Sequence, residues 1–205
     1  MLRFLAMIIL YVGKYWMLSC CHCCELPKLE KEIDYSELTG TWYETVHPGE
    51  TIYKVVSCET LQYQSGANGS FSAKWSFQKI EKSQNKSLGI SNAYFARIAP
   101  STFLATNEIG MKKIENAILQ DVNDATAHKI ESEMDAPKYM PIVHIVEKNA
   151  YVMVLMCDLF GMKKVYVSTS DPLPKTKTLL KIHNKLVEVG NGWADVKLNL
   201  AQCSQ

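Results

Sequence analysis

Apolar and polar residues alternate along most of the chain between residues 42 and 168, with the period of two that is typical of β-strands. In the clearest segment, Phe71, Ala73, Trp75 and Phe77 are separated by small or polar residues, which predicts one buried and one solvated face. The pattern predicts about eight antiparallel strands. The segments that fit are residues 42–47, 53–64, 71–78, 90–98, 141–146, 151–156 and 164–168, with less regular candidates near residue 103 and at 114–119 and 128–134.

The period changes after residue 170. Two prolines within residues 171–174 interrupt the strand pattern, and the apolar residues that follow have helical spacing. Four of them fall on one face: Leu179, Ile182, Leu186 and Val189. Gly190-Asn191-Gly192 is a typical helix stop. The segment therefore predicts an amphipathic helix, followed by a short closing strand over residues 193–200.

Up-and-down strands in this number can close into a barrel, which removes the sheet edges and leaves space for one small ligand. The same spacings also permit a two-sheet sandwich. The single late helix favours the barrel. We therefore predict an all-β fold, an eight-stranded antiparallel up-and-down β-barrel with one C-terminal α-helix packed outside.

The N-terminus has the layout of a secretory signal peptide. Arg3 precedes a continuous apolar run from Phe4 to Val12, and small residues follow. Lys14 leaves this run shorter than the roughly 20 residues that a membrane-spanning helix needs. We expect a signal peptide over residues 1–21 and a single domain over 22–205, with an uncleaved anchor as the alternative. No stable membrane insertion is expected.

The chain has seven cysteines, which are expected to be oxidised outside the cell. Four crowd around the predicted cleavage site (Cys20, Cys21, Cys23 and Cys24) and three are isolated (Cys58, Cys157 and Cys203). No second ligand pair accompanies the crowded cluster, so no metal site is predicted. The sequons at Asn68 and Asn85, both at predicted turns, are consistent with export and glycosylation.

Composition excludes two broad classes of function. The net charge is +1 and no Lys/Arg-rich block occurs, which argues against a nucleic-acid partner. The chain has no Gly-x-Ser-x-Gly elbow, no His-Glu-x-x-His motif and no phosphate-binding glycine loop, so no enzyme is predicted. We expect a monomer or a weakly associated dimer.

The segment Gly40-Thr41-Trp42 opens the first predicted strand, where the glycine allows a sharp turn and the indole can close the end of a sheet. Cys24 lies 18 residues before Trp42 and Cys58 lies 16 after it, while Cys157 ends a strand and Cys203 is in the tail. With the late helix, these features resemble the lipocalin family, above all the branch of the insect bilin-binding lipocalins and apolipoprotein D.

The resemblance covers residues 24–205 and implies the bridges Cys24–Cys157 and Cys58–Cys203, although sequence alone allows three pairings of four cysteines. The chain departs from the family in two ways. The family usually places an arginine near the end of its last barrel strand, stacked on the tryptophan, and residues 167–171 contain none. The interval between Cys58 and Cys157 is also longer, with the surplus expected near residues 98–125, so the ligand cannot be carried over from the family.

The expected barrel interior follows from alternation on the first strand and from the resemblance on the later ones. Trp42 and Glu44 should lie inside near the closed end, with Val46 further up. The candidate ligand-binding residues are Trp42, Glu44, Val46, Tyr139, Val143, Val152, Val154, Met156, Lys164 and Tyr166. Each of the apolar residues could equally be plain core, and Glu44 could be satisfied by a neighbouring tyrosine or backbone group.

An apolar wall with a few polar groups suits a lipid, a retinoid, a pheromone-like molecule or a pigment. The leading hypothesis is therefore a secreted lipocalin that carries or sequesters a small hydrophobic ligand. The alternative is a lipocalin-fold module with a filled barrel, such as a salivary inhibitor, that binds a protein partner through loops at the barrel mouth. His47, His128 and His144 are candidates for haem ligation, but a lone histidine in a strand is more often a surface or satisfied residue, so no cofactor is predicted.

Overall fold

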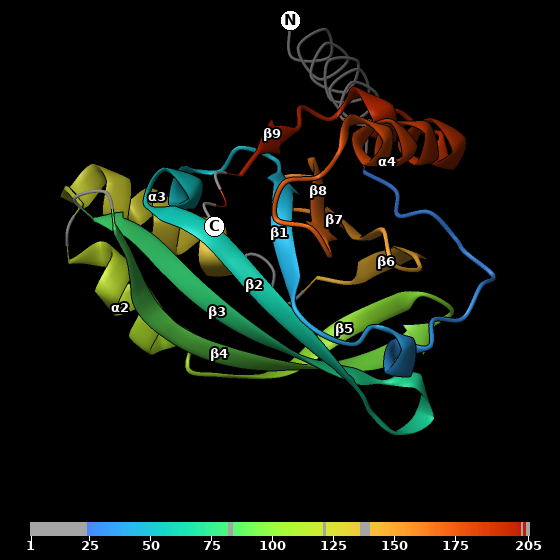
Figure 1. Ribbon diagram of the computed structural model, residues 1–205, viewed down its shortest axis with the longest axis horizontal. Coiled ribbons are helices and arrows are strands. Elements are labelled where there is room, and N and C mark those ends of the chain that lie inside the picture. The colour runs from blue at the N-terminus through green and yellow to red at the C-terminus, as the bar shows by residue number, and fades with distance from the viewer. Residues whose placement is uncertain (1–23, 82–83, 121, 136–139, 202, 204–205) are drawn as a thin grey trace, which may run out of the picture.

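The computed structural model describes residues 24–81, 84–120, 122–135, 140–201 and 203 (Figure 1). These residues form one sheet of nine strands, in the order β2-β3-β4-β5-β6-β7-β8-β1-β9, and β1 also pairs with β2. That pairing closes β1 to β8 into an antiparallel up-and-down barrel. The strands are β1 (Trp42–His47), β2 (Val56–Ser65), β3 (Phe71–Glu81), β4 (Gln84–Ala99), β5 (Thr102–Ile109), β6 (Ile142–Glu147), β7 (Tyr151–Cys157), β8 (Lys163–Thr169) and β9 (Asn199–Leu200).

The barrel confirms the predicted fold class and excludes the sandwich. Its two halves are joined by short ladders: β1 pairs with β2 at two positions, Trp42 with Leu61 and Tyr43 with Thr60. The β5–β6 ladder is equally short, whereas β2, β3 and β4 pair along most of their length. Long strands therefore form one half of the barrel and short strands the other.

Helices lie at two places on the barrel. Helices α2 (Met111–Leu119) and α3 (Asp124–Asp135) lie together beside the ends of β2, β3 and β4, whereas α4 (Thr176–Val189) lies across β7 and β8 on the opposite side (Figure 1). Single 3₁₀ turns complete the described chain: η1 (Tyr35–Glu37), η2 (Thr51–Lys54), η3 (Ala67–Gly69) and η5 (Trp193–Asp195). Helix α4 is the predicted C-terminal helix, and it ends at Gly190.

The strands predicted at residues 114–119 and 128–134 are wrong, because these segments belong to α2 and α3. In α2, Ile114 and Ile118 are four residues apart and both are fully buried, which is the spacing of a helix face. Ile130 of α3 joins them in one cluster with Ile52 and Phe77. The two helices therefore pack against the barrel at its mouth. Helix α2 lies within the stretch near residues 98–125 where the surplus residues were expected.

The closing strand predicted over residues 193–200 is also shorter than expected. Residues 193–195 form η5, and only Asn199–Leu200 pair with β1 as β9. Trp193 is fully buried in a cluster between the barrel and α4. Packing of this indole against α4 replaces the strand pairing that the alternation pattern predicted.

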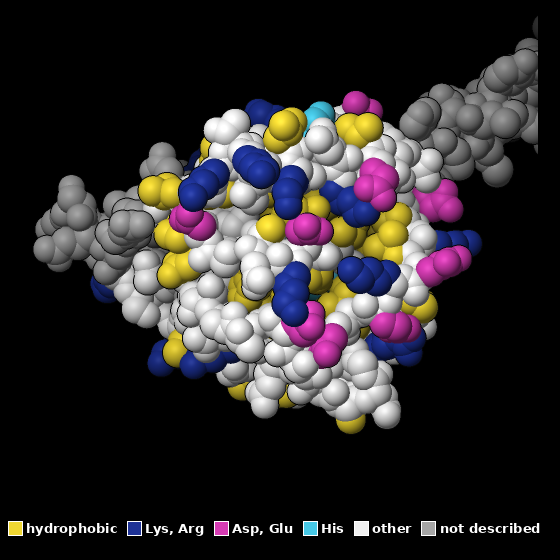
Figure 2. All heavy atoms as spheres, turned by 45° about the vertical axis from the view of Figure 1, so that its right-hand side comes forward, with side chains coloured by type: hydrophobic (Ala, Val, Ile, Leu, Met, Phe, Trp, Pro, Cys, Tyr) yellow, Lys and Arg dark blue, Asp and Glu magenta, His cyan; other side chains and the backbone are white. Residues whose placement is uncertain are grey.

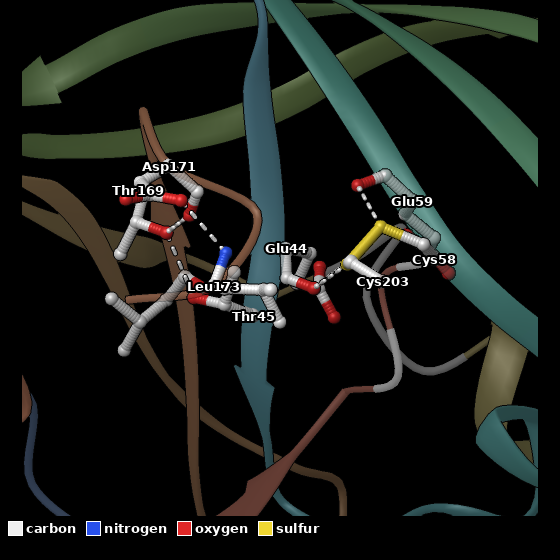
Figure 3. Close-up of a disulfide and its surroundings, with 9 residues drawn as sticks. Glu44, Thr45, Cys58, Glu59, Thr169, Asp171, Leu173 and Cys203 are labelled. Carbon is white, nitrogen blue, oxygen red and sulfur yellow. Dashed lines mark hydrogen bonds between the residues drawn. A yellow bond between two sulfur atoms is a disulfide. The ribbon is translucent and has the colours of Figure 1, made fainter. Parts of the chain in front are cut away.

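Both disulfides implied by the resemblance are present. Cys24 is bonded to Cys157, with 5.6 Å between the Cα atoms, and Cys58 is bonded to Cys203, with 4.9 Å. The second bridge lies beside β1 and joins β2 to the C-terminal tail, and the sulfur of Cys203 is 3.6 Å from the carbonyl oxygen of Glu44 (Figure 3). Because each bridge closes a loop of more than a hundred residues, the chain-entropy model gives about 4–5 kcal/mol of stabilisation for each.

The remaining sequence predictions concern the N-terminus, Tyr139, the two sequons and membrane insertion. The predicted signal peptide, with Cys20, Cys21 and Cys23, and the candidate Tyr139 lie outside the described residues. Asn68 is exposed in η3, at a left-handed φ of 54°, whereas Asn85 lies within β4 instead of the predicted turn. None of the described helices is both long and apolar enough to span a bilayer. On the face shown in Figure 2, acidic and basic side chains are interspersed.

Candidate ligand-binding cavity

The barrel encloses a cavity of about 660 Å³ that is lined by residues from all of its eight strands, η2 and the first turn of α2. Alternation along β3 directs Phe71, Ala73, Trp75 and Phe77 into it, on the face that the sequence predicted to be buried. Further apolar lining comes from Leu61, Ala93, Phe95, Ile142, Val154 and Met156. Most of the wall is therefore aromatic or aliphatic.

The closed end of the barrel, which we call the floor, is filled by side chains. Tyr35 of η1 stacks on Phe71, with 4.0 Å between ring centroids, and Phe71 stacks on Phe95 at 4.6 Å. The Tyr35 hydroxyl is 2.7 Å from Nδ1 of His144, which is 2% exposed. Burial lowers the pKa of His144 to about 3, so this ring is neutral at physiological pH. In the floor, the Tyr35 hydroxyl and the His144 ring therefore satisfy each other, whereas the indole N–H of Trp42 is buried without a hydrogen-bond partner.

A different arrangement lies further up the interior, where three carboxyl groups face the cavity. Glu44 comes from β1, Glu50 from the loop before η2, and Glu59 from β2. We call these three residues the carboxyl wall. The β1–β2 ladder pairs Trp42 with Leu61 and ends at Tyr43 with Thr60. The same register continued by one position would bring Glu44 to face Glu59, and the charge of Glu44 does act on Glu59.

Two of the three carboxyl groups have partners. The Tyr53 hydroxyl donates a hydrogen bond to Oε1 of Glu44. Glu50 accepts a hydrogen bond from the Tyr166 hydroxyl at 2.9 Å and forms an ion pair with Lys164, whose Nζ lies 3.1 Å from Oε1. Lys164 also lies 3.9 Å from Asp158. The positive charge of Lys164 is therefore already shared between two carboxylates.

Glu59 is the exception. It is 7% exposed, and its carboxyl group has no hydrogen-bond or ion-pair partner among the described residues. Burial, together with the neighbouring charges of Glu44 and Glu50, raises the pKa of Glu59 well above its ordinary value. A buried carboxyl group without a hydrogen-bond partner lowers the stability of the fold, whereas an apolar side chain at the same position would not.

The pKa of Glu44 is raised to about 8, first by burial and then by the charge of Glu50, although the hydrogen bond from Tyr53 lowers it. At neutral pH Glu44 is therefore mainly protonated in the free protein, and the raised pKa of Glu59 favours its protonated form in the same direction. Perturbed carboxyl groups of this kind that face a cavity are typical of functional sites. The protonated carboxyl groups of the wall can donate or accept hydrogen bonds. A carboxyl group can also lose its proton and become negatively charged when a cation binds beside it.

The candidate residues from the sequence fall into three groups. Four line the cavity: Glu44, Val154, Met156 and Tyr166. Trp42 and Val152 are buried in the floor cluster below it, and Lys164 lies at the wall through its ion pair with Glu50. Val46 and Val143 lie elsewhere, in the cluster between the barrel and α4.

The inward orientation predicted for Val46 and Val143 is wrong for two reasons. Along β1 a bulge between Glu44 and Val46 breaks the alternation against β8, so that Val46 faces outward. On β6 the prediction was shifted by one residue, because Ile142 and His144 face the cavity while Val143 faces α4. A shift of one residue in a strand exchanges its two faces.

The three histidines lie in separate environments. His144 is in the floor, His47 stacks on Tyr53 at 3.8 Å near the mouth, and His128 is exposed on α3 beside Glu131. Burial lowers the pKa of His47 to about 4, and its Nδ1 accepts a hydrogen bond from the Gly49 amide. Within the described part of the chain, no group of three or more His, Cys, Asp or Glu side chains could hold a metal ion.

Trp42 lacks the cationic partner that the family usually supplies, as the sequence indicated. Among the described residues the cation–π contact is between Lys163 and Trp193, at 5.8 Å, on the outside of the barrel. Trp42 is 3% exposed and packs among the apolar side chains of the floor. Apolar packing therefore holds this indole without a stacked arginine.

Sequence reasoning missed Glu50, Tyr53, Glu59 and Trp75 as lining residues. A signal for Glu59 was present, because a disulfide-bonded Cys58 on the outer face directs the next side chain inward. Trp75 had been assigned to a buried face, but the face was not connected with the cavity. Glu50 and Tyr53 come from the loop between β1 and β2, whose path local pattern does not determine.

At the level of sequence, no family model and no curated protein matches the chain. Solved structures do match its fold. Insecticyanin from the tobacco hornworm Manduca sexta superposes with a TM-score of 0.57 at 9% identity, covering 89% of this chain and 87% of that one. The major allergen Per a 4 from cockroaches gives 0.52 at 12% identity, covering 81% and 87%. The chain has the lipocalin fold. In this lipocalin fold, α2 packs on β4 and lines one side of the mouth, α3 packs on η2, and the carboxyl wall lies inside the barrel.

Proposed function

We propose that this lipocalin-fold protein is secreted and carries or sequesters one small, mostly apolar organic molecule in its barrel. The observation that carries the proposal is the cavity of about 660 Å³ with its aromatic and aliphatic lining. Ligand pockets for small molecules are typically about 300–1,000 Å³, mostly apolar, with a few placed polar groups. The cavity has this size and this composition.

Export is supported by two independent features. The two disulfides in the described chain favour an oxidising compartment, and the first 21 residues have the composition of a signal peptide. Lipids, retinoids, pheromone-like molecules and pigments are all of a suitable chemical type for the apolar lining. The protein needs no cofactor and no catalytic step for this role.

The alternative, a protein-binding module, was expected to have a barrel filled by side chains. The cavity is hollow above the floor, which favours the small-molecule role. We therefore place a protein partner at the mouth second. It would contact α2 and α3, whose buried faces already pack on the barrel through Ile114, Ile118 and Ile130.

The test is titration of the secreted protein with neutral apolar probes, retinol and 4-phenylbutanol, while tryptophan emission from Trp75 is recorded. Replacing Ala73 or Ala105 by Phe places a ring in the cavity, because both alanines line it. We expect at least a tenfold loss of affinity for each variant. The matched control is Lys74→Phe, on the same strand as Ala73 but exposed on the outer face, which should bind as the unmodified protein does.

Circular dichroism and thermal melting verify that each variant is folded. The absence of binding by every probe would refute the proposal. Equal binding by Ala73→Phe, Ala105→Phe and the control would also refute it, because the ligand would then lie outside the barrel.

A further inference from the structure

An apolar ligand leaves the carboxyl wall unexplained. The β1–β2 register, continued by one position beyond its last pair, brings Glu44 and Glu59 to facing positions, where two ionised carboxylates would repel each other. The buried titratable side chains of the floor, Tyr35 and His144, are hydrogen-bonded to each other. Glu59 instead faces the cavity without a partner. The missing partner is therefore expected to come from the ligand.

The charge of the wall selects against two ligand classes. A metal ion is unsuitable, because within the described residues no three carboxylate, histidine or cysteine groups are close enough to hold one. An anionic headgroup would meet three carboxyl groups, while the nearby Lys164 is already paired with Glu50 and Asp158. Lys112, which also lines the cavity, is exposed at the mouth on α2.

The apolar surroundings of Glu59 indicate the rest of the ligand. The β2–β3 register places Phe77 directly opposite Glu59 and Trp75 opposite Leu61, and all four side chains line the cavity. Trp75 also packs edge-on against Phe95. A group bound at Glu59 would therefore continue into a pocket of aromatic rings, which favour both apolar contact and a nearby cation.

We propose that the ligand is a small organic cation, a protonated amine on an aromatic or aliphatic body, whose ammonium group is held between Glu59 and Glu44. This inference rests on the proposed function and specifies the class of ligand. An ammonium group has three N–H donors. Glu59 offers two free oxygens, and Glu44 offers the oxygen that Tyr53 does not occupy.

Binding of a cation at this place is coupled to release of a proton. In the free protein a pKa of about 8 keeps a proton on Glu44 at pH 7, and burial shifts the pKa of Glu59 in the same direction. A bound ammonium favours the ionised carboxylate, so one proton leaves as the ion pair forms. The other carboxyl group retains its proton, because two charges so close repel each other.

The other titratable groups around the wall do not take part in this exchange. Glu50, Tyr53, Tyr63, Lys164 and Tyr166 face it from the β1–β2 loop, β2 and β8, with His144 below and Glu108 and Lys112 at the mouth. Burial raises the pKa values of the three tyrosines, so they stay neutral, and His144 is neutral above its pKa of about 3. Lys164 and Glu50 form an ion pair.

The test compares three probes of matched size, 4-phenylbutylamine, 4-phenylbutanol and 4-phenylbutyrate, by isothermal titration calorimetry of the secreted protein. We expect the amine to bind at least tenfold more tightly than the alcohol, and the carboxylate to bind most weakly. Titrations in buffers with different ionisation enthalpies should show release of about one proton with the amine and none with the alcohol. Amine affinity should rise up to tenfold per pH unit between pH 6 and 8.

The variants Glu59→Gln and Glu44→Gln separate a ligand contact from a structural role. Each should reduce amine affinity at least tenfold with alcohol binding retained, and the double variant Glu44→Gln/Glu59→Gln should abolish proton release. Glu188→Gln, exposed on α4, is the matched control and should leave both ligands unaffected. An equal loss of amine and alcohol binding would show that the wall only shapes the cavity and would overturn the inference.

Two outcomes distinguish this inference from the proposed function. Equal affinity for the amine and the alcohol in the unmodified protein would overturn the cation assignment and leave the carrier role in place. Failure of all three probes and of retinol would overturn the carrier role itself.

Discussion

The two ends of the barrel interior differ in whether their buried titratable side chains have partners. In the floor, the Tyr35 hydroxyl and the His144 ring form a hydrogen bond of 2.7 Å inside a set of stacked aromatic rings. At the carboxyl wall, Glu44 and Glu59 are close enough for the charge of one to act on the other, and the Glu59 side chain has no partner among the described residues. Both regions are buried to a similar degree, so burial alone does not account for the difference.

The comparison separates a region that stabilises the fold from a region that costs stability. Paired polar groups in a packed interior add to stability and specificity, while a partly satisfied group reduces stability. Residues that break local rules of satisfaction are expected at functional sites, where the fold has to compensate for them. Four predictions test this division, beginning with the largest expected effect.

Replacing Trp42 by Ala should lower the free energy of unfolding by about 3–5 kcal/mol, because a large side chain of the floor is lost from a packed cluster. Urea denaturation measures the change. Tyr94→Ala, on the exposed outer face of β4, is the matched control and should stay within about 0.5 kcal/mol. A loss below about 1 kcal/mol for Trp42→Ala would show that the floor is not a packed structural unit.

The free energy of unfolding should depend on pH through titrating groups of both the carboxyl wall and the floor. The fold holds the pKa of Glu44 near 8, above its ordinary 4.5, so the protonated form is favoured and stability falls as pH rises through this window. The slope is up to about 1.4 kcal/mol per pH unit for each such carboxyl group, and Glu59 acts in the same direction. His144 and His47 have lowered pKa values, so their contribution is lost as pH falls below 6.5.

Maximum stability is therefore expected between about pH 4.5 and 6.5, with a decline on both sides. Urea denaturation from pH 3.5 to 8 measures the curve. The double variant Glu44→Gln/Glu59→Gln should flatten the alkaline decline and leave the acid decline unchanged. A maximum near pH 8 in the unmodified protein would contradict the assignment of protonated carboxyl groups to the wall.

Replacing Glu59 by Leu should raise the free energy of unfolding by about 1–3 kcal/mol, because an unsatisfied polar group is replaced by an apolar one of similar size. Glu44→Leu is the comparison variant. It should gain less, since it removes the acceptor of the Tyr53 hydrogen bond. If Glu59→Leu is destabilised instead, the wall contributes to the fold and the contrast with the floor fails.

The smallest effect is expected at the hydrogen bond of the floor. Tyr35→Phe should lower stability by about 1–2 kcal/mol, because Nδ1 of His144 is left buried without its partner. Thermal melting at pH 6 gives the difference relative to Tyr94→Phe, which alters an exposed hydroxyl. No difference between the two variants would mean that the floor hydrogen bond adds nothing to stability.

The barrel could be predicted from the sequence wherever one face of a strand is apolar, as in Phe71, Ala73, Trp75 and Phe77. The helices α2 and α3 were missed because short windows were read with a period of two. Over the whole segment, Met111, Ile114 and Ile118 recur at three and four residues, which is the helical period. A longer window would have shown it. The disulfide pairing came from family resemblance, and the sequence alone left three choices.

The candidate site was harder to predict because it depends on register. Glu44 was placed inside correctly from alternation, but the bulge that follows it turns Val46 outward, and nothing in the local sequence marks that bulge. Val143 was assigned to the wrong face of β6 by one residue. Glu59 became visible as a partner of Glu44 only when the β1–β2 ladder was known. The carboxyl wall is thus a tertiary feature.

The central claim is that the barrel interior above the floor binds one small molecule through the carboxyl wall. A crystal structure of the protein with 4-phenylbutylamine tests it most directly. We predict one amine in the cavity, with its nitrogen about 2.7–3.0 Å from a carboxylate oxygen of Glu59 and its ring between Trp75 and Phe77. An empty cavity, or an amine whose nitrogen points to the mouth and away from Glu59, would contradict the account.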